Sequence, residues 1–169
     1  MNKIKIFLIS LLLISCGGTA ENLTVGDKAP DFTLQDSQGN SYTLSSYQNQ
    51  SPVIVYFYPK ANTPGCTTEA CGIRDDYAKF EENGIKVFGI SVDSKKDIQE
   101  FINDHNLNFP LLSDETKEVA KKYGVLNELG KASRVTFIVD KEGKLAHIIR
   151  DVDVTTHSDQ VFELANKLP

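Results

Sequence analysis

The run from Val53 to Tyr58 is the most restrictive pattern in this sequence of 169 residues. All six residues are β-branched or aromatic, so the run predicts a strand that is buried on both faces. Helix-like stretches and further apolar runs alternate after it. We therefore predict one α/β domain with a mixed central sheet flanked by helices.

The elements around this strand can be placed by their periodicity. Two short alternating runs, 32–34 and 42–44, flank a turn that contains a glycine and predict an N-terminal β-hairpin. A second hairpin near the end makes the sheet mixed. We expect helices at about 67–82, 95–105, 116–123 and 158–168, and strands at about 86–92, 109–112, 134–140 and 145–149.

Charge and cysteine content exclude two classes of protein. The formal net charge is −5 and the sequence pI is about 5.2, which argues against nucleic acid as the main partner, because phosphate binding needs a basic face. Three cysteines are too few to hold together a disulfide-rich scaffold in a chain this long. The cysteines are therefore candidates for chemistry.

The first 15 residues predict a targeting segment that lies outside the fold. Lys3 and Lys5 precede a short apolar run at 6–14, which is too short to span a bilayer as a helix. The following Leu13-Ile14-Ser15-Cys16 resembles the bacterial lipobox, in which the cysteine is acylated and becomes the new N-terminus; a plain signal peptide with a chance cysteine is the alternative.

The lipobox divides the chain into three parts and predicts a location. We expect a lipoprotein signal peptide at 1–15, a lipidated N-terminus and tether at 16–23, and the folded domain at 24–169. A protein acylated on Cys16 would be extracytoplasmic and anchored to a bacterial membrane by its lipid, on the periplasmic side in a Gram-negative cell.

The segment from Pro59 to Cys71 follows the buried strand and opens a helix, which is where α/β folds place their sites. Cys66 falls in the first helical turn, where unpaired backbone N–H groups and the helix dipole stabilise an anion such as a thiolate. At about 100° per residue, Cys66 shares the core-facing stripe with Ala70, Ile73, Tyr77 and Phe80.

Cys71 faces a different direction from Cys66. It lies five residues further on, turned roughly 140° away, with a Cα separation of about 8 to 9 Å if both are helical. A disulfide requires Cα atoms within about 7 Å. The two cysteines can therefore be bonded only if the start of the helix unwinds.

Three other interpretations of the cysteines stay open at this point. A buried free cysteine on an apolar face is usually inert packing. A metal site is the second interpretation, but two cysteines at this spacing lack two further ligands and the three histidines are scattered. A thioredoxin-type exchange site is the third, but its Cys-x-x-Cys motif is absent.

The whole segment resembles the peroxiredoxins, and within them the bacterioferritin comigratory protein or peroxiredoxin Q group. The Pro-x-x-x-Thr-x-x-Cys signature is complete as Pro59, Thr63 and Cys66, and the group's Thr-Pro-Gly-Cys-Thr-x-Glu-Ala-Cys runs from Thr63 to Cys71. Further matches are at 25–34, 56–59, 109–114 and 134–140. The resemblance covers about residues 24–169.

The resemblance implies a thioredoxin-like fold and a set of roles. Cys66 is expected to be the peroxidatic cysteine and Cys71 the resolving cysteine, with Pro59, Thr63 and Arg134 completing the active site. Without the motif, Arg134 could equally be a solvated arginine at a strand edge and Thr63 a turn residue. Glu69 could brace the arginine, but the helix dipole explains a glutamate there equally well.

The expected activity is that of an antioxidant thiol peroxidase. It would reduce hydrogen peroxide and organic hydroperoxides with electrons from a thioredoxin-like dithiol, as a monomer and without metal, haem or flavin. One departure from the group is the short stretch at 126–133 before Arg134, which puts the identity of the reductant in doubt. His105, His147 and His157 have no assignable role.

Two rival functions follow from the same residues. The first is an extracytoplasmic thiol–disulfide oxidoreductase on the same fold, against which the missing Cys-x-x-Cys counts. The second is a non-catalytic lipoprotein that binds a partner, for which a complete active-site motif would be unexpected.

Overall fold

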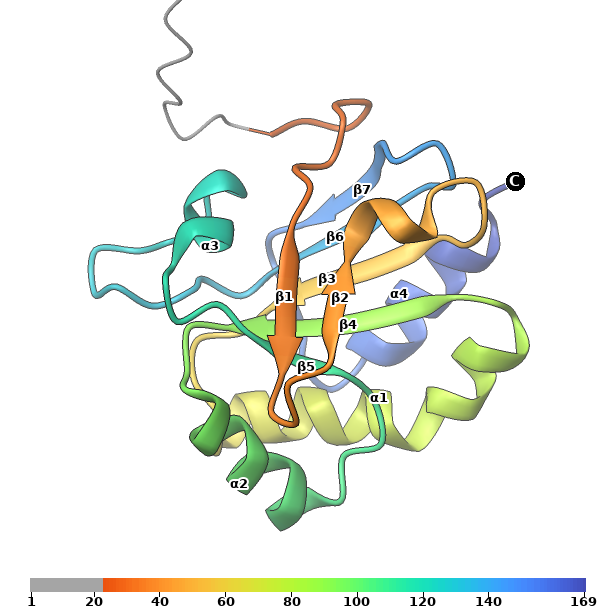
Figure 1. The fold of residues 1–169 in the computed structure, drawn as a ribbon. Helices are drawn as coiled ribbons and strands as arrows, with labels where there is room; N and C mark the ends of the chain where they lie inside the picture. The colour runs from red at the N-terminus through yellow and green to blue at the C-terminus, as the bar shows by residue number, and fades with distance from the viewer. Residues whose placement is uncertain (1–22) are drawn as a thin grey trace, which may run out of the picture.

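Seven strands form one mixed sheet in the computed structural model, which describes residues 23–169 (Figure 1). The spatial order of the strands is β2-β1-β5-β4-β3-β6-β7. The strands are β1 (Thr33–Asp36), β2 (Ser41–Thr43), β3 (Val53–Phe57), β4 (Lys86–Ser91), β5 (Leu111–Ser113), β6 (Val135–Val139) and β7 (Leu145–Ile149). The helices are α1 (Pro64–Glu82), α2 (Lys95–His105), α3 (Glu118–Lys122) and α4 (His157–Asn166), with a 3₁₀ turn η1 at Leu44–Tyr47.

Strand β3 lies in the middle of the sheet, as its composition predicts. All five of its residues are buried. It pairs in parallel with β4 and antiparallel with β6, which confirms that the sheet is mixed. Alternate side chains of β3 enter two separate cores, because successive residues of a strand point to opposite faces.

The two faces of the sheet are covered by different elements. Ile54 and Tyr56 pack with apolar residues of α1, α2 and α4. Val53, Val55 and Phe57 pack with residues of η1, α3 and the segment that precedes β1. The candidate site lies on the face covered by α1 and α4.

Position 89 in β4 requires a residue without a side chain. A Cβ at Gly89 would lie 2.5 Å from Leu111 Cδ2 and 2.6 Å from the Cζ and hydroxyl oxygen of Tyr56. The phenol of Tyr56 therefore occupies the space above this glycine.

Several boundaries differ from those predicted. Helix α1 begins at Pro64 rather than near 67 because proline, with its fixed φ and missing N–H, suits the first helical position. Strand β5 begins only after Pro110, which has no N–H to donate to a ladder. Helix α3 is shorter than predicted, at 118–122. Helix α4 begins at His157, one residue early.

The N-terminal predictions lie largely outside the described residues. The signal peptide at 1–15 and Cys16 are not among residues 23–169. Leu23, expected to end the tether, is instead buried in the core, and its carbonyl accepts a hydrogen bond from Arg150 at 3.2 Å. Within 23–169 no helix is both long and apolar enough to cross a membrane.

The short stretch before Arg134 folds back as a tight turn. Leu126 and Ala132 form an antiparallel bridge, and Asn127 N–H donates to Lys131 C=O at 2.9 Å. Leu129 at the tip is 84% exposed. The turn returns the chain directly to the edge of the sheet where β6 begins.

Candidate active site

Cys66 is a buried thiol at the start of α1. It is the third residue of the helix and is 2% exposed. Ala70, Ile73 and Phe80 lie in the same core cluster and Tyr77 packs against it, so the predicted stripe is confirmed. The sulfur thus lies near the N–H groups of the first helical turn, in a region largely protected from water.

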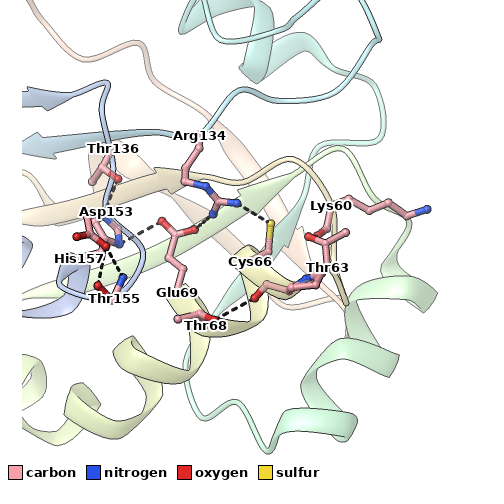
Figure 2. A network of polar contacts seen from close by, with 11 residues as sticks. Lys60, Thr63, Cys66, Thr68, Glu69, Arg134, Thr136, Asp153, Thr155 and His157 are labelled. Carbon is pink, nitrogen blue, oxygen red and sulfur yellow. Dashed lines mark hydrogen bonds and ion pairs between the residues drawn. The ribbon is translucent and has the colours of Figure 1, made fainter.

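Arg134 approaches this sulfur from the neighbouring strand. Because β3 and β6 are antiparallel and Phe57 pairs with Val135, the end of β3 and the start of β6 share one edge of the sheet. Arg134 Nη2 donates a hydrogen bond to Cys66 Sγ at 3.2 Å (Figure 2). A Cβ at Gly65 would lie 3.3 Å from this same nitrogen, so the glycine leaves room for the guanidinium.

Glu69 holds the other end of the guanidinium. Its Oε2 forms an ion pair with Arg134 Nη1, and its side chain is fully buried. Burial raises the pKa of Glu69 to about 7, although the charge of Arg134 and its hydrogen bond act to lower it. Glu69 follows Cys66 by three residues, which places both on one face of α1.

His157 lies behind Glu69, at the start of α4. Its Nδ1 is 3.1 Å from Glu69 Oε1, and its Nε2 is 2.8 Å from Thr136 Oγ1 on β6. Burial, together with the charge of Arg134, lowers the pKa of His157 to about 4. The imidazole is therefore neutral near pH 7.

Thr63 and Pro59 border the start of α1. Thr63 is the extended residue before the helix, and its hydroxyl donates to Lys60 C=O at 2.9 Å; Figure 2 shows its side chain beside the Cys66 end of α1. Pro59 is half-buried and follows β3 by two residues. Both therefore lie in the loop that joins the central strand to the cysteine.

Cys71 is separated from Cys66 within the same helix. It is half-buried, and both thiols are free. Helix α1 is continuous from 64 to 82, so the five-residue spacing keeps the two sulfur atoms on different faces.

The arrangement suits a nucleophilic thiolate. The sulfur lies at a helix start and accepts a hydrogen bond from a permanent cation, and both features favour reaction as a nucleophile. Among residues 23–169 there is no group of three or more His, Cys, Asp and Glu side chains that could hold a metal ion.

Residues 25–148 match the model of the AhpC/TSA family. The chain belongs to the AhpC/TSA family. Within the family, it is 42% identical over 147 residues to Peroxiredoxin Bcp of Escherichia coli strain K12, an alignment that covers 83% of this chain and 94% of the relative. The predicted enzyme class, a thiol-dependent peroxidase, is thereby confirmed.

Solved structures in the family share the fold. The crystal structure of Peroxidoxin BcpB from Mycobacterium tuberculosis superposes with a TM-score of 0.80 at 33% identity, covering 88% of this chain and 99% of that one. A structure of the Xanthomonas campestris bacterioferritin comigratory protein, solved to explain its alkyl peroxide reduction activity, has a TM-score of 0.72 at 31% identity and covers 78% and 88% of the two chains. The predicted thioredoxin-like peroxiredoxin fold is confirmed.

Two members of the polar network were not among the predicted site residues. Glu69 carried a signal, since it lies one turn after Cys66, but a helix expected to begin near 67 put it in the first turn, where a glutamate needs no partner; the structure puts it in the second turn. His157 carried none, because it is 88 positions after Glu69 in sequence and only the folded sheet brings α4 beside α1.

Proposed function

We propose that the protein reduces hydrogen peroxide and organic hydroperoxides with Cys66 as the peroxidatic and Cys71 as the resolving cysteine. The observation that carries the proposal is the 3.2 Å hydrogen bond from Arg134 to a buried sulfur at the start of a helix. The family relationship supports it, and so does the alkyl peroxide reduction activity of the Xanthomonas campestris relative.

In the first step, the Cys66 thiolate attacks one oxygen of ROOH. A new S–O bond forms while the O–O bond breaks, and the leaving RO⁻ takes a proton to become ROH. Cys66 is then a sulfenic acid. The Arg134 guanidinium provides a donor for the charge that moves onto the leaving oxygen, and the Thr63 hydroxyl, which donates to Lys60 C=O, accepts from the peroxide. Pro59 shapes the loop and shields the sulfur.

In the second step, the Cys71 thiol attacks the sulfenic sulfur and water leaves. An external dithiol then reduces the resulting disulfide by exchange. The sum is ROOH + 2 RSH → ROH + H₂O + RSSR. Because α1 is continuous across both cysteines, its first turns must open between the two steps.

Opening of the start of α1 is opposed by polar contacts with α2. Asn62 Nδ2 donates to Asp104 Oδ2 at 3.1 Å, and Asn62 Oδ1 is 3.1 Å from His105 Nε2. Arg74 Nη1 donates to the carbonyl of His105 at 2.7 Å. We call these contacts the α1–α2 clasp.

A peroxide assay with two cysteine variants tests this function. Cys66→Ser should abolish peroxide-dependent consumption of a dithiol. Cys71→Ser should allow one stoichiometric oxidation and then stop as a sulfenic acid, which mass spectrometry detects. Rapid insulin reduction without peroxide turnover would instead favour a thiol–disulfide oxidoreductase, and inactivity in both assays a non-catalytic protein.

The lipobox supports a second part of the proposal. We propose that Cys16 is acylated and that the enzyme works outside the cytoplasm, where a dedicated thioredoxin-like dithiol must keep it reduced. Cys16→Ala should lose metabolic palmitate label and leave the membrane fraction. Unmodified, full-length protein in the cytosol, kept reduced there by cytosolic thioredoxin, would contradict this location.

A further inference from the structure

His157 of α4 and the Cys66 sulfur lie at the two ends of a line of polar side chains. It is fully buried, with Nδ1 facing Glu69 Oε1 at 3.1 Å. The other oxygen of Glu69 pairs with Arg134 Nη1, whose Nη2 donates to Cys66 Sγ at 3.2 Å. Figure 2 shows these residues converging from α4, α1 and the start of β6.

The two atoms that meet between His157 and Glu69 have no alternative partner. Although they lie 3.1 Å apart, His157 Nδ1 and Glu69 Oε1 are not aligned as a hydrogen bond, and neither atom has a hydrogen-bond partner among residues 23–169. A buried polar atom without a partner is costly, so each atom depends on the other.

Glu69 determines which ring nitrogen of His157 carries the proton. When Glu69 is ionised its oxygens only accept, so the N–H of the neutral imidazole is favoured at Nδ1, which faces Oε1. The neutral imidazole then accepts the Thr136 hydroxyl proton at Nε2, over 2.8 Å. Thr136 and Glu69 therefore constrain the imidazole from both sides.

We propose that His157 is a positioning residue for the peroxide step: by holding Glu69 Oε1 it keeps Oε2 on Arg134, and so keeps the guanidinium on the Cys66 sulfur. The inference rests on the proposed function of Cys66 and Arg134. It makes the first residue of α4 part of the apparatus that orients the arginine.

Other groups around the imidazole belong to three elements. Tyr56 of β3 presents its ring edge-on at a centroid distance of 5.9 Å, and its hydroxyl is buried without a partner among the described residues. Burial, with the nearby Glu69 charge, raises the pKa of Tyr56 well above its usual value, so it stays neutral. Ser158, the next residue of α4, donates to Asp76 Oδ2 of α1 at 2.7 Å.

The experiment compares two replacements of His157 in two backgrounds. His157→Phe keeps an aromatic ring but removes both nitrogens, whereas His157→Asn can retain an N–H near the position of Nδ1. Each is made alone and together with Glu69→Gln. All variants carry Cys71→Ser, so that a single oxidation of Cys66 by hydrogen peroxide is measured as a second-order rate constant.

If His157 acts through Glu69, the losses will not add. His157→Phe should lower the rate constant by ~10-fold alone but by less than ~2-fold when Glu69→Gln is already present. His157→Asn should stay within ~3-fold of the parent. Ser158→Ala is the matched control, because it loosens the same helix start without touching Glu69; it should stay within ~2-fold.

Three results would overturn the inference. Equal losses from His157→Phe in both backgrounds would mean that it does not act through Glu69. A loss from Ser158→Ala as large as that from His157→Phe would assign the effect to the docking of α4. If His157→Phe fails to fold, Thr136→Val decides, because it removes the group that holds His157 Nε2; a rate unchanged across pH 5.5–8.5 in that variant would remove the role.

A second readout separates this inference from the proposed function. The rate at which iodoacetamide alkylates Cys66 needs no peroxide chemistry, yet it depends on the contact between Arg134 and the sulfur. Its pH dependence should shift with His157→Phe alone and not in the Glu69→Gln background. A parent protein that fails to reduce peroxide but shows this pattern would contradict the function while supporting the positioning role.

Discussion

The first turns of α1 make contacts of two different kinds on their two sides. Toward β6 and α4, Glu69 meets Arg134 and His157 in a buried polar network. Toward α2, the α1–α2 clasp is formed by Asn62 and Arg74, mostly at the surface. Residues 62–74, which comprise the end of the loop before α1 and the first part of the helix, are therefore held by buried charges on one side and mostly by exposed polar groups on the other.

The difference matches the two demands of the proposed cycle. Removing one partner of a buried ion pair typically costs about 3–5 kcal/mol, whereas an exposed polar pair contributes about 0–1 kcal/mol. The peroxide step requires a rigid donor beside the sulfur. The disulfide step requires a helix start that opens, and the α1–α2 clasp resists this opening only weakly.

Replacing the arginine should have the largest effect on the buried side. Arg134→Met should lower the second-order rate constant for Cys66 oxidation by ~100-fold or more, because a transition-state donor is lost. Stopped-flow kinetics with hydrogen peroxide measures it. Arg150→Met is the matched control, since Arg150 donates to the Leu23 carbonyl rather than to the buried network; a rate for Arg134→Met within threefold of wild type would remove Arg134 from the mechanism.

The buried network should also shape the pH dependence of stability, with opposite signs for its two titrating groups. The pKa of His157, lowered to about 4, gives stability that is present above its unfolded value of 6.5 and is lost as pH falls through 4. The pKa of Glu69, raised to about 7, gives stability that is present below 4.5 and is lost as pH rises through 7.

Single replacements should show how His157 and Glu69 each change the free energy of unfolding with pH. Relative to wild type, His157→Asn should gain on the order of 2 kcal/mol in free energy of unfolding as pH falls from 7 to 4.5. Glu69→Gln should gain relative to wild type as pH rises over the same interval. Urea unfolding followed by circular dichroism at several pH values measures both, and shifts of the same sign in the two variants would contradict the assignment.

Loosening the exposed side should give the smallest effect. Asp104→Ala removes the carboxylate that accepts from Asn62 and should speed disulfide formation by ~2-fold, because exposed pairs contribute so little. The ratio of disulfide to Cys66 sulfinic acid at high peroxide, read by mass spectrometry, should rise accordingly. Glu100→Ala on α2, which breaks only the surface pair with Lys96, should leave this ratio unchanged.

The elements that sequence predicts best are those whose signal is local. Strand β3 lies at its predicted position because its continuous apolar run determines it. Helix α2 does so because of its amphipathic period and the capping residue Ser94 at its start. The motif brought Cys66 and Arg134 into one hypothesis, and the structure places them in contact. Their catalytic roles remain predictions.

The rest of the site depends on contacts between distant segments. Nothing near His157 in the sequence indicates a partner, since its neighbours Thr136 and Glu69 lie on a strand and a helix far earlier in the chain. The start of α1 differs from the prediction for a local reason: Pro64 favours the first helical position, so the helix begins before the apolar stripe that predicted it.

Gly89 of β4 affects the active site through its close contact with Tyr56. An added methyl group would collide with Leu111 and with the phenol of Tyr56, whose ring lies edge-on against His157. Substitution there must therefore displace the ring that backs the imidazole, although position 89 touches none of the reacting atoms. In terms of mutational tolerance, a library at this position would show glycine required both for folding and for the speed of peroxide reduction.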